Sequence, residues 1–151
     1  MSVASDLTNA AATLAASSTA GLTWRSDGTA YAVSETGIYR KRLPDGLRGL
    51  AITVVMQEDD PVQPLGRAMI QLKARGTKNS PTDPDDILDA CFTVMHGVRG
   101  LVAGSCTILQ LLRGVRVPMG DDSAGAWELI DQYYADLDYP STPLRPDAGY
   151  W

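Results

Sequence analysis

The chain has 151 residues, of which 44% are hydrophobic, and its 13 Lys and Arg against 18 Asp and Glu give a formal charge of −5. This length is typical of one globular domain whose core needs neither disulfides nor a metal ion. The acidic balance argues against a general affinity for nucleic acid or anionic membranes, because both require a basic face.

The first predicted element is a helix over residues 5–18, where the sequence is rich in alanine. Apolar side chains recur on one side of its helical wheel, and Gly21 supplies a left-handed exit. Residues 22–44 contain interrupting glycines, scattered aromatic residues and a short basic cluster. That composition predicts a loop with short extended pieces.

Two segments in the middle of the chain predict an antiparallel pair of strands. Residues 50–57 (LAITVVMQ) are β-branched and nearly all apolar, as in a strand buried on both faces or across a subunit contact. Residues 68–75 alternate between apolar and polar with the period of two expected for a sheet with one covered face. Prolines and acids over residues 58–64 predict the turn between them.

A second helix is predicted after a turn-rich segment. Asp83 has the character of an N-cap, and Pro84 suits the first helical position, where its missing N–H costs nothing. Apolar side chains then recur with helical spacing as far as Met95, and Gly97 ends the helix.

The last third of the chain predicts two more strands. Residues 106–113 (CTILQLLR) predict a strand that continues to Val117, and residues 118–125 predict a loop. Residues 127–139 match both the alternation of a strand and the stripe of a helix. Several aromatic residues in so short a run favour the strand.

Together these elements predict an α+β fold in which the two helices pack on a mostly antiparallel sheet of about four strands. We assign residues 1–139 to a single domain and residues 140–151, which begin with a proline-rich stretch, to an extended C-terminal tail. The final aromatic residues, Tyr150 and Trp151, are consistent with docking on another surface and equally with a tail folded back on its own domain.

The sequence contains little that is typical of an enzyme or a metalloprotein. His96 is the single histidine, and its place at the end of the second predicted helix favours a structural role. The motifs of a nucleophile elbow, a phosphate-binding loop and a dinucleotide-binding turn are missing, so we predict no catalytic residue, cofactor or metal. The least supported alternative is a small cytosolic enzyme with a site built from Asp121, Asp122, Glu128 and His96.

Signals for export and membrane insertion are missing as well. No window approaches the run of about 20 apolar residues that a membrane span needs, and residues 1–20 lack the pattern of a secretory signal. The two cysteines do not have the spacing of a metal or redox pair, which indicates a reducing compartment. We expect a soluble protein that is not secreted.

Charge is distributed unevenly along the chain. Residues 117–144 contain six acids and no Lys or Arg, whereas the basic residues concentrate in residues 40–48 and 67–78. This division is consistent with solubility alone. It is also consistent with self-association, in which an acidic edge of one subunit meets a basic edge of the next, and such a head-to-tail contact closes into a ring if the rotation permits.

Several segments follow one another in a recognisable order after the N-terminal helix. They are the LPDG turn at residues 43–46, the strand AITVVMQ, the strand RAMIQLKARG, the helix opening SPTDPDDILDACFTVMHG and the late segment WELIDQYYADLDYPSTPLRP. From about Ala4 to Pro146, this succession resembles the tail terminator proteins of long-tailed (siphovirus-type) bacteriophages, a head-to-tail joining family sometimes described as minor capsid proteins.

The resemblance implies a structural protein of the virion rather than an enzyme. Tail terminators form a hexameric ring on the finished tail tube, stop its polymerisation and present a surface to the head-completion and connector proteins. The implied location is the neck of the tail, after assembly in the host cytoplasm, with no membrane partner. The residues expected at ring or neck interfaces are Arg75, Gly76, Tyr133, Tyr134, Tyr150 and Trp151.

The resemblance also gives the acidic residues a use. Genome DNA would pass through the ring without tight binding, because a channel lined by carboxylates repels phosphate. The residues expected to line this channel are Asp59, Asp60, Asp121 and Asp122. An alternative role in the same neck is that of a head-completion or tail-tube protein, since such proteins can share a fold with terminators.

Overall fold

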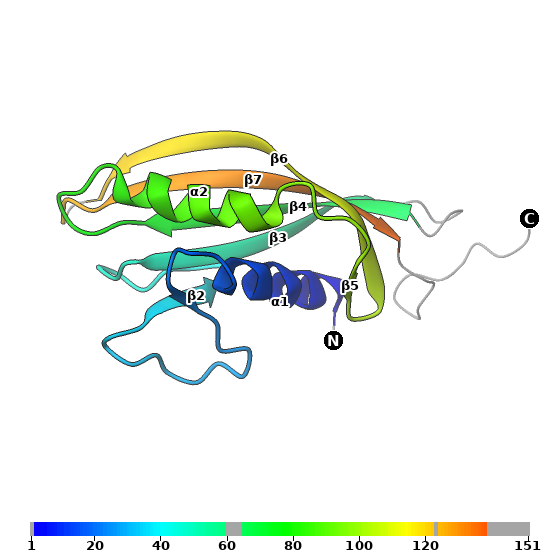
Figure 1. Ribbon diagram of the computed structural model, residues 1–151, viewed down its shortest axis with the longest axis horizontal. Coiled ribbons are helices and arrows are strands. Elements are labelled where there is room, and N and C mark those ends of the chain that lie inside the picture. Colours follow the sequence, from blue (N-terminus) through cyan, green and yellow to red (C-terminus); the bar gives the residue numbers. More distant parts are fainter. Residues whose placement is uncertain (1, 60–64, 123, 139–151) are drawn as a thin grey trace, which may run out of the picture.

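The structure is a computed structural model that describes residues 2–59, 65–122 and 124–138. Within these residues the elements in chain order are α1 (Val3–Ala16), β1 (Leu22–Thr23), β2 (Thr36–Arg40), β3 (Gly49–Asp59), β4 (Leu65–Arg75), α2 (Asp83–Met95), β5 (Leu101–Ala103), β6 (Cys106–Asp121) and β7 (Trp127–Asp138). All strands join one sheet in the order β1-β2-β3-β4-β7-β6-β5, and both helices lie on the same side of it (Figure 1).

The prediction of a mostly antiparallel sheet of about four strands is wrong, because the sheet has seven strands and is mixed. The four predicted strands are its long central ones, β3, β4, β7 and β6, and they are antiparallel neighbours. The other strands, β1, β2 and β5, have only 2, 5 and 3 residues, too few for a periodic signal. β1 and β2 lie in residues 22–44, for which the sequence predicts a loop with short extended pieces and no sheet strand. β1 and β2 extend one edge by parallel pairing, which depends on the tertiary arrangement.

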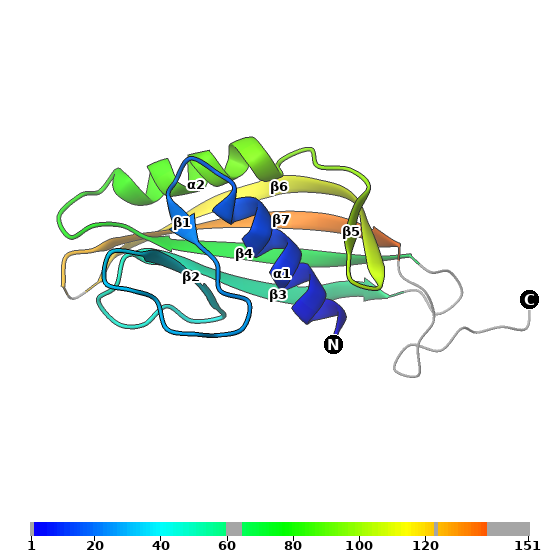
Figure 2. The ribbon, with the colours of Figure 1, turned by 60° about the horizontal axis from the view of Figure 1, so that its bottom comes forward.

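The sheet curls around α1 into a half-barrel. α1 packs on β3 and also reaches β1 and β2 on one edge of the sheet and β5 on the other edge. Figure 2 shows α1 crossing the strands obliquely with α2 beside it, and α2 packs on β4, β7 and β6. The helices therefore fill the concave face, and within the described residues the convex face of the central strands has no covering helix.

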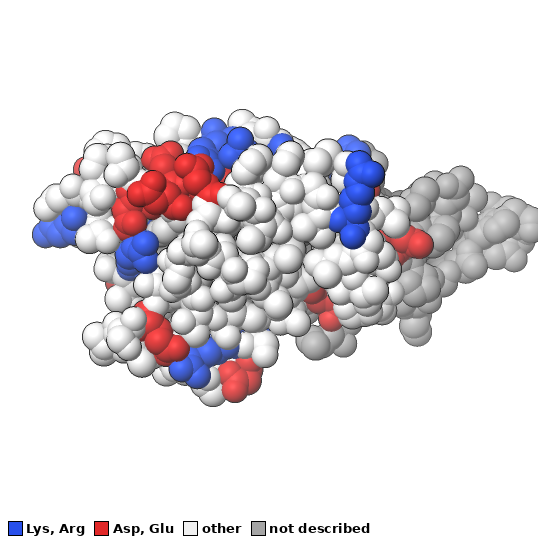
Figure 3. All heavy atoms as spheres, viewed as in Figure 1, with Lys and Arg blue, Asp and Glu red and all other residues white. Residues whose placement is uncertain are grey.

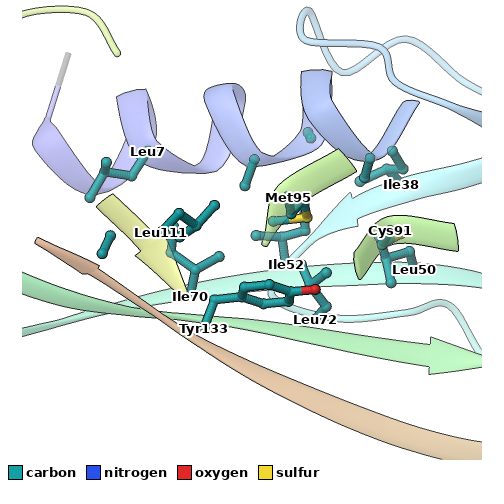
Figure 4. Packing of buried hydrophobic residues seen from close by; sticks show 14 of the residues in the cluster. Leu7, Ile38, Leu50, Ile52, Ile70, Leu72, Cys91, Met95, Leu111 and Tyr133 are labelled. Carbon is teal, nitrogen blue, oxygen red and sulfur yellow. The ribbon is translucent and has the colours of Figure 1, made fainter. Parts of the chain in front are cut away.

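The hydrophobic core lies between the helices and the concave face. Leu7 of α1, Met95 of α2, Ile70 of β4, Leu111 of β6 and Tyr133 of β7 are all fully buried there, and Figure 4 shows them pointing into one cluster. Burial of each such side chain contributes about 1.5–3 kcal/mol. The sequence expectation of helices packed on a sheet is confirmed in this respect.

The start of α2 differs from the prediction. Thr82, not Asp83, occupies the N-cap position, and Asp83 is the first residue of the helix. The Asp83 carboxylate accepts hydrogen bonds from the backbone N–H of Thr77 at 2.6 Å and from Nε of Arg48 at 2.7 Å. Asp83 therefore joins the helix to the preceding turn and to the chain before β3, which the local sequence does not reveal.

The boundary of β6 also differs. The strand continues to Asp121, through half of the predicted loop of residues 118–125. It stays paired because β7 runs beside it over its whole length, as far as the pair Asp121–Trp127. The preference for a strand over residues 127–139 is confirmed for residues 127–138, which form β7 between β4 and β6.

Candidate interaction surface

The convex face of the sheet carries a row of apolar side chains that crosses all four central strands. Register places Val55 of β3 beside Met69 of β4, Met69 beside Tyr134 of β7, and Tyr134 beside Leu112 of β6. Val55 is 44% exposed and Leu112 is 38% exposed. These four residues are named the convex row below. Neighbours in sequence such as Ile70, Leu111 and Tyr133 point to the core, because side chains alternate between the two faces of a sheet.

A bulge in β6 brings Tyr134 close to the backbone. The register of β6 against β7 shifts between Arg113 and Val115, and Gly114 is the extra residue. A Cβ on Gly114 would lie 2.3 Å from Cε2 of Tyr134, so the aromatic ring packs directly over the glycine. The bulge also keeps Val115, which is 45% exposed, on the convex face, where it extends the apolar surface.

Charged pairs lie on both sides of the convex row. On one side of the row, near the pair formed by Leu65 at the start of β4 and Asp138 at the end of β7, Nε of Arg67 lies 3.0 Å from Oδ1 of Asp136. On the other side, Glu128 of β7 receives Nζ of Lys73 at 3.6 Å and NH2 of Arg75 at 3.0 Å. The convex face thus has an apolar centre and a polar border, the usual anatomy of a protein interface.

The structure gives Arg75 and Gly76, both predicted at an interface, roles inside the chain. Arg75 is only 8% exposed, and its NH1 donates to the carbonyl oxygens of Pro44 at 2.6 Å and Leu47 at 3.3 Å. A Cβ on Gly76 would lie 2.6 Å from Cδ of Pro84, so only glycine fits at the close approach to α2. Together they join the loop before β3 and the start of α2 to the end of β4.

The two predicted interface tyrosines lie on opposite faces of β7. Tyr134 belongs to the convex row, whereas Tyr133 is fully buried on the concave face. Burial raises the pKa of Tyr133, and within the described residues its hydroxyl has no hydrogen-bond partner. Tyr133 is therefore a core residue and not part of a surface. Tyr150 and Trp151 lie outside the described residues.

An ionic network joins α2 to β6 and β7 on the concave side. The carboxylate of Asp131, which is fully buried, accepts from Nε and NH2 of Arg116 at 2.6 and 2.9 Å. NH1 of Arg116 also contacts Asp89 at 2.7 Å and Asp85 at 3.7 Å. Figure 3 shows acidic side chains gathered beside basic ones over this end of α2. The network holds the helix against the sheet.

The four acids predicted to line a channel divide between the two ends of the sheet. Asp59 ends β3 beside Gly66, its side chain is not described, and Asp60 lies outside the described residues. Asp121 lies at the opposite end, beside Trp127. Because β3 spans residues 49–59, the two ends are about 33 Å apart at 3.3 Å per residue.

Asp121 and Asp122 have different surroundings. Asp121 is exposed, whereas the Asp122 carboxylate accepts from the backbone N–H groups of Ala126 and Ala124, both at 2.9 Å. These hydrogen bonds, that of Ala126 first, lower the pKa of Asp122. Asp122 also lies 3.6 Å from Nε of Arg75. Asp122 therefore shapes the turn between β6 and β7, and Asp121 is the acid available to a partner.

The four residues of the alternative enzyme site do not converge. His96 accepts a hydrogen bond at Nδ1 from the backbone N–H of Arg113, 3.0 Å away, and stacks on Phe92. Asp121 lies eight residues further along β6, about 26 Å from that point. Among the described residues, no three or more His, Cys, Asp or Glu side chains are grouped so as to bind a metal ion.

Sequence reasoning missed the convex row, although the sequence contained a partial signal for it. Residues 68–75 show the alternation that defines one covered face, but Met69 is apolar on the other face as well.

Neither helix in the described part of the chain is long and apolar enough to cross a membrane. No protein-family model and no curated protein matches this chain.

Proposed function

We propose that this protein is a tail terminator of a long-tailed bacteriophage, a structural protein of the virion neck. It would form a hexameric ring on the tail tube, stop tube polymerisation and join the tail to the head connector. The observation that carries this proposal is the convex row, an apolar strip across an uncovered sheet face with a polar border. Such a strip is stabilised when another protein surface covers it. The order of segments that resembles tail terminators supports the same class.

The free edges of the sheet support head-to-tail contact between subunits. Within the described residues, β2 pairs with β3 only as far as Ile52, and β5 pairs with β6 only as far as Ile108. The outer edge of β3 after Ile52 and that of β6 after Arg113 have no strand partner there. Unpaired edges are templates for strand addition. Because β3 and β6 run in opposite directions, the β3 edge of one copy and the β6 edge of another would pair as antiparallel strands.

The positions of the acids constrain how a ring would surround DNA. Asp59 and Asp121 are at opposite ends of the sheet, about 33 Å apart. Both can line one channel only if the strands run along the channel axis. In that arrangement carboxylates lie near both openings, where they repel the phosphate backbone and disfavour its retention.

Native mass spectrometry of the full chain, alone and with the neighbouring tail-tube protein, tests this function. A terminator gives a single ring that caps the tube protein and ends its growth. Long stacks of this chain would instead identify it as a tube protein. A monomer that ignores the tube protein would contradict the proposal.

Substitution of the convex row sharpens the same experiment. Leu112→Lys places a charge in the row and should abolish capping, because an unpaired ammonium group would be buried at the contact. Val102→Lys is the matched control, since Val102 is 69% exposed on β5, away from the row. Equal capping by both variants would exclude the convex row as the contact surface.

A further inference from the structure

A pocket rich in aromatic side chains lies at one edge of the sheet, in the chain around β1 and β2. Its volume is about 380 Å³, and its walls include Trp24, Tyr31 and Tyr39 together with Arg25 and Arg40. The rings of Tyr31 and Tyr39 meet edge to face, with centroids 5.1 Å apart. The guanidinium of Arg40 lies 4.5 Å from the centre of the Trp24 ring. These five residues are named the aromatic pocket.

Hydrogen bonds and close packing fix the aromatic pocket to α1 and β2. Nε1 of Trp24 donates to Oδ1 of Asn9 on α1 at 2.9 Å. The Tyr31 hydroxyl donates to the Ile38 carbonyl of β2, and its ring lies against Gly37, where a Cβ would be 2.7 Å away. The aromatic walls are therefore fixed before any ligand arrives, which lowers the entropic cost of binding.

The polar groups of the aromatic pocket that are left for a ligand include the hydroxyl of Tyr39 and the buried Nε of Arg25, which has no hydrogen-bond partner within the described residues. Within the described residues, the Tyr39 hydroxyl forms no hydrogen bond. The other two aromatic donors, Nε1 of Trp24 and the hydroxyl of Tyr31, already donate to Asn9 and to the Ile38 carbonyl. Burial raises the pKa of Tyr39, so its hydroxyl keeps the proton at neutral pH. Aromatic walls with a hydroxyl donor match an extended, proline-rich peptide, whose rings pack on the aromatics and whose carbonyl groups accept hydrogen bonds.

The chain itself contains a segment with this chemistry. Pro140, Pro143 and Pro146 recur every third residue in the stretch PSTPLRP. The polyproline II helix has three residues per turn, so these prolines would form one continuous face of it. Tyr150 and Trp151 follow shortly afterwards and supply further apolar surface.

Geometry directs this segment to another molecule. β7 ends at Asp138, whose partner Leu65 starts β4 at the end of the sheet near Asp59. The aromatic pocket lies at the other end, where Ile38 pairs with Leu50. The nine residue-to-residue steps from Leu50 to Asp59 span about 30 Å, whereas Pro143 lies at most about 18 Å from Asp138. Pro140 and Pro143 therefore cannot reach the pocket of their own chain, and the repeat as a whole fits only in the pocket of another copy.

We propose that residues 140–146 of one copy dock as a polyproline II segment in the aromatic pocket of a second copy. Because the donor segment and the pocket lie at opposite ends of the molecule, the contact is head-to-tail and each copy can both give and receive. It requires no tail tube and does not depend on the function proposed above.

Fluorescence anisotropy tests the pocket with a labelled peptide of residues 139–151. The receptor is the full chain carrying Pro140→Ala, Pro143→Ala and Pro146→Ala, whose own segment cannot compete. We expect binding that weakens at least tenfold when Tyr39→Ala is added, and an intermediate loss for Tyr39→Phe, which removes only the hydroxyl. Circular dichroism checks that each receptor is folded. If the Tyr39→Ala variant is not folded, the loss of peptide binding in the Tyr39→Phe variant decides the test.

Matched peptides test the ligand. A peptide with Ser141→Ala and Thr142→Ala keeps the prolines and should bind as the native peptide does, whereas replacement of the three prolines should abolish binding. Binding that is insensitive both to the prolines and to Tyr39 would overturn the proposal.

Dilution separates contact between chains from contact within one chain. A segment docked on its own chain acts at an effective concentration near millimolar and would block the peptide at every protein concentration. Docking between chains leaves the pocket of the wild-type chain free at nanomolar concentration. We therefore expect the diluted wild-type chain to bind the peptide as tightly as the proline variant does. A wild-type chain that fails to bind the peptide at every dilution would contradict docking between copies.

Discussion

Single ionic contacts decide how several elements meet, and Asp83 shows this at the scale of one residue. Its carboxylate receives Arg48 and the Thr77 backbone, and the Arg48 hydrogen bond is the largest cause of a pKa lowered to about 2. A carboxyl whose pKa is lower in the folded state stabilises the fold above its unfolded pKa, near 3.9, and loses that effect as the pH falls toward 2.

We therefore expect Asp83→Asn to reduce the free energy of unfolding by about 2 kcal/mol at pH 7. The difference from wild type should shrink between pH 4 and pH 2, as measured by urea denaturation at each pH. Asp86→Asn is the control, because Asp86 is exposed in the same helical turn and has no ion pair within the described residues. A difference that stays constant down to pH 2 would contradict the role given to Asp83.

Asp131 carries a larger energetic weight because it is fully buried. Removal of one member of a buried ion pair leaves the other charge without its partner, which costs about 3–5 kcal/mol. We expect Asp131→Ala to lose about 3 kcal/mol in urea denaturation, since Arg116 keeps its contact with Asp89. Asp85→Ala removes an outer contact at 3.7 Å and should cost less than about 1 kcal/mol. Equal losses would show that the inner pair has no special weight.

At the scale of elements, the bulge in β6 ties the convex face to one glycine. Gly114→Ala places a methyl group 2.3 Å from the Tyr134 ring and should destabilise the fold by about 1–3 kcal/mol. A double-mutant cycle measures the cause, because Gly114→Ala should cost much less in a Tyr134→Ala background. The same cost in both backgrounds would assign the effect to the backbone and not to the ring.

The pairing of elements also explains why the outer strands of the sheet were harder to predict than its central strands. Residues 68–75 alternate clearly because β4 lies in the middle of the sheet with one helix-covered face. β2 is a strand of 5 residues, second from one edge of the sheet and parallel to both neighbours, and its partner β3 begins nine residues later. No local pattern encodes that pairing, because it depends on the chain folding back beside β3.

At the scale of the whole molecule, the proposed channel gives the acids a test. Asp122 is excluded from it because its carboxylate holds the turn between β6 and β7. The variant with Asp59→Asn, Asp60→Asn and Asp121→Asn should assemble normally. It should slow the ejection of genome DNA, because the channel then has fewer carboxylates and repels the phosphates less strongly. Ejection from purified particles measures the rate, and particle yield checks assembly. An unchanged rate with normal yield would contradict a channel lined by these residues.

The neighbouring residues Tyr133 and Tyr134 show how far sequence reasoning reached at the candidate site. Both were predicted at an interface, and the period of two along a strand necessarily separates them onto opposite faces. Which face the helices cover is a tertiary property, and it buries Tyr133 while leaving Tyr134 in the convex row. Arg75 was likewise predicted at an interface, but the loop that ends near Leu47 folds over it.

The sequence by itself predicted both helices, the strands at residues 50–57, 68–75 and 106–113, and the antiparallel pairing of the first two, because local periodicity and β-branched composition mark them. For residues 127–139 periodicity matched both strand and helix, and aromatic content favoured the strand that the structure shows. Only the tertiary structure decided the short edge strands, the curl of the sheet around α1, the convex row and the aromatic pocket. Each of these requires contacts between segments far apart in the chain, and the energies of such contacts leave no periodic trace in either segment alone.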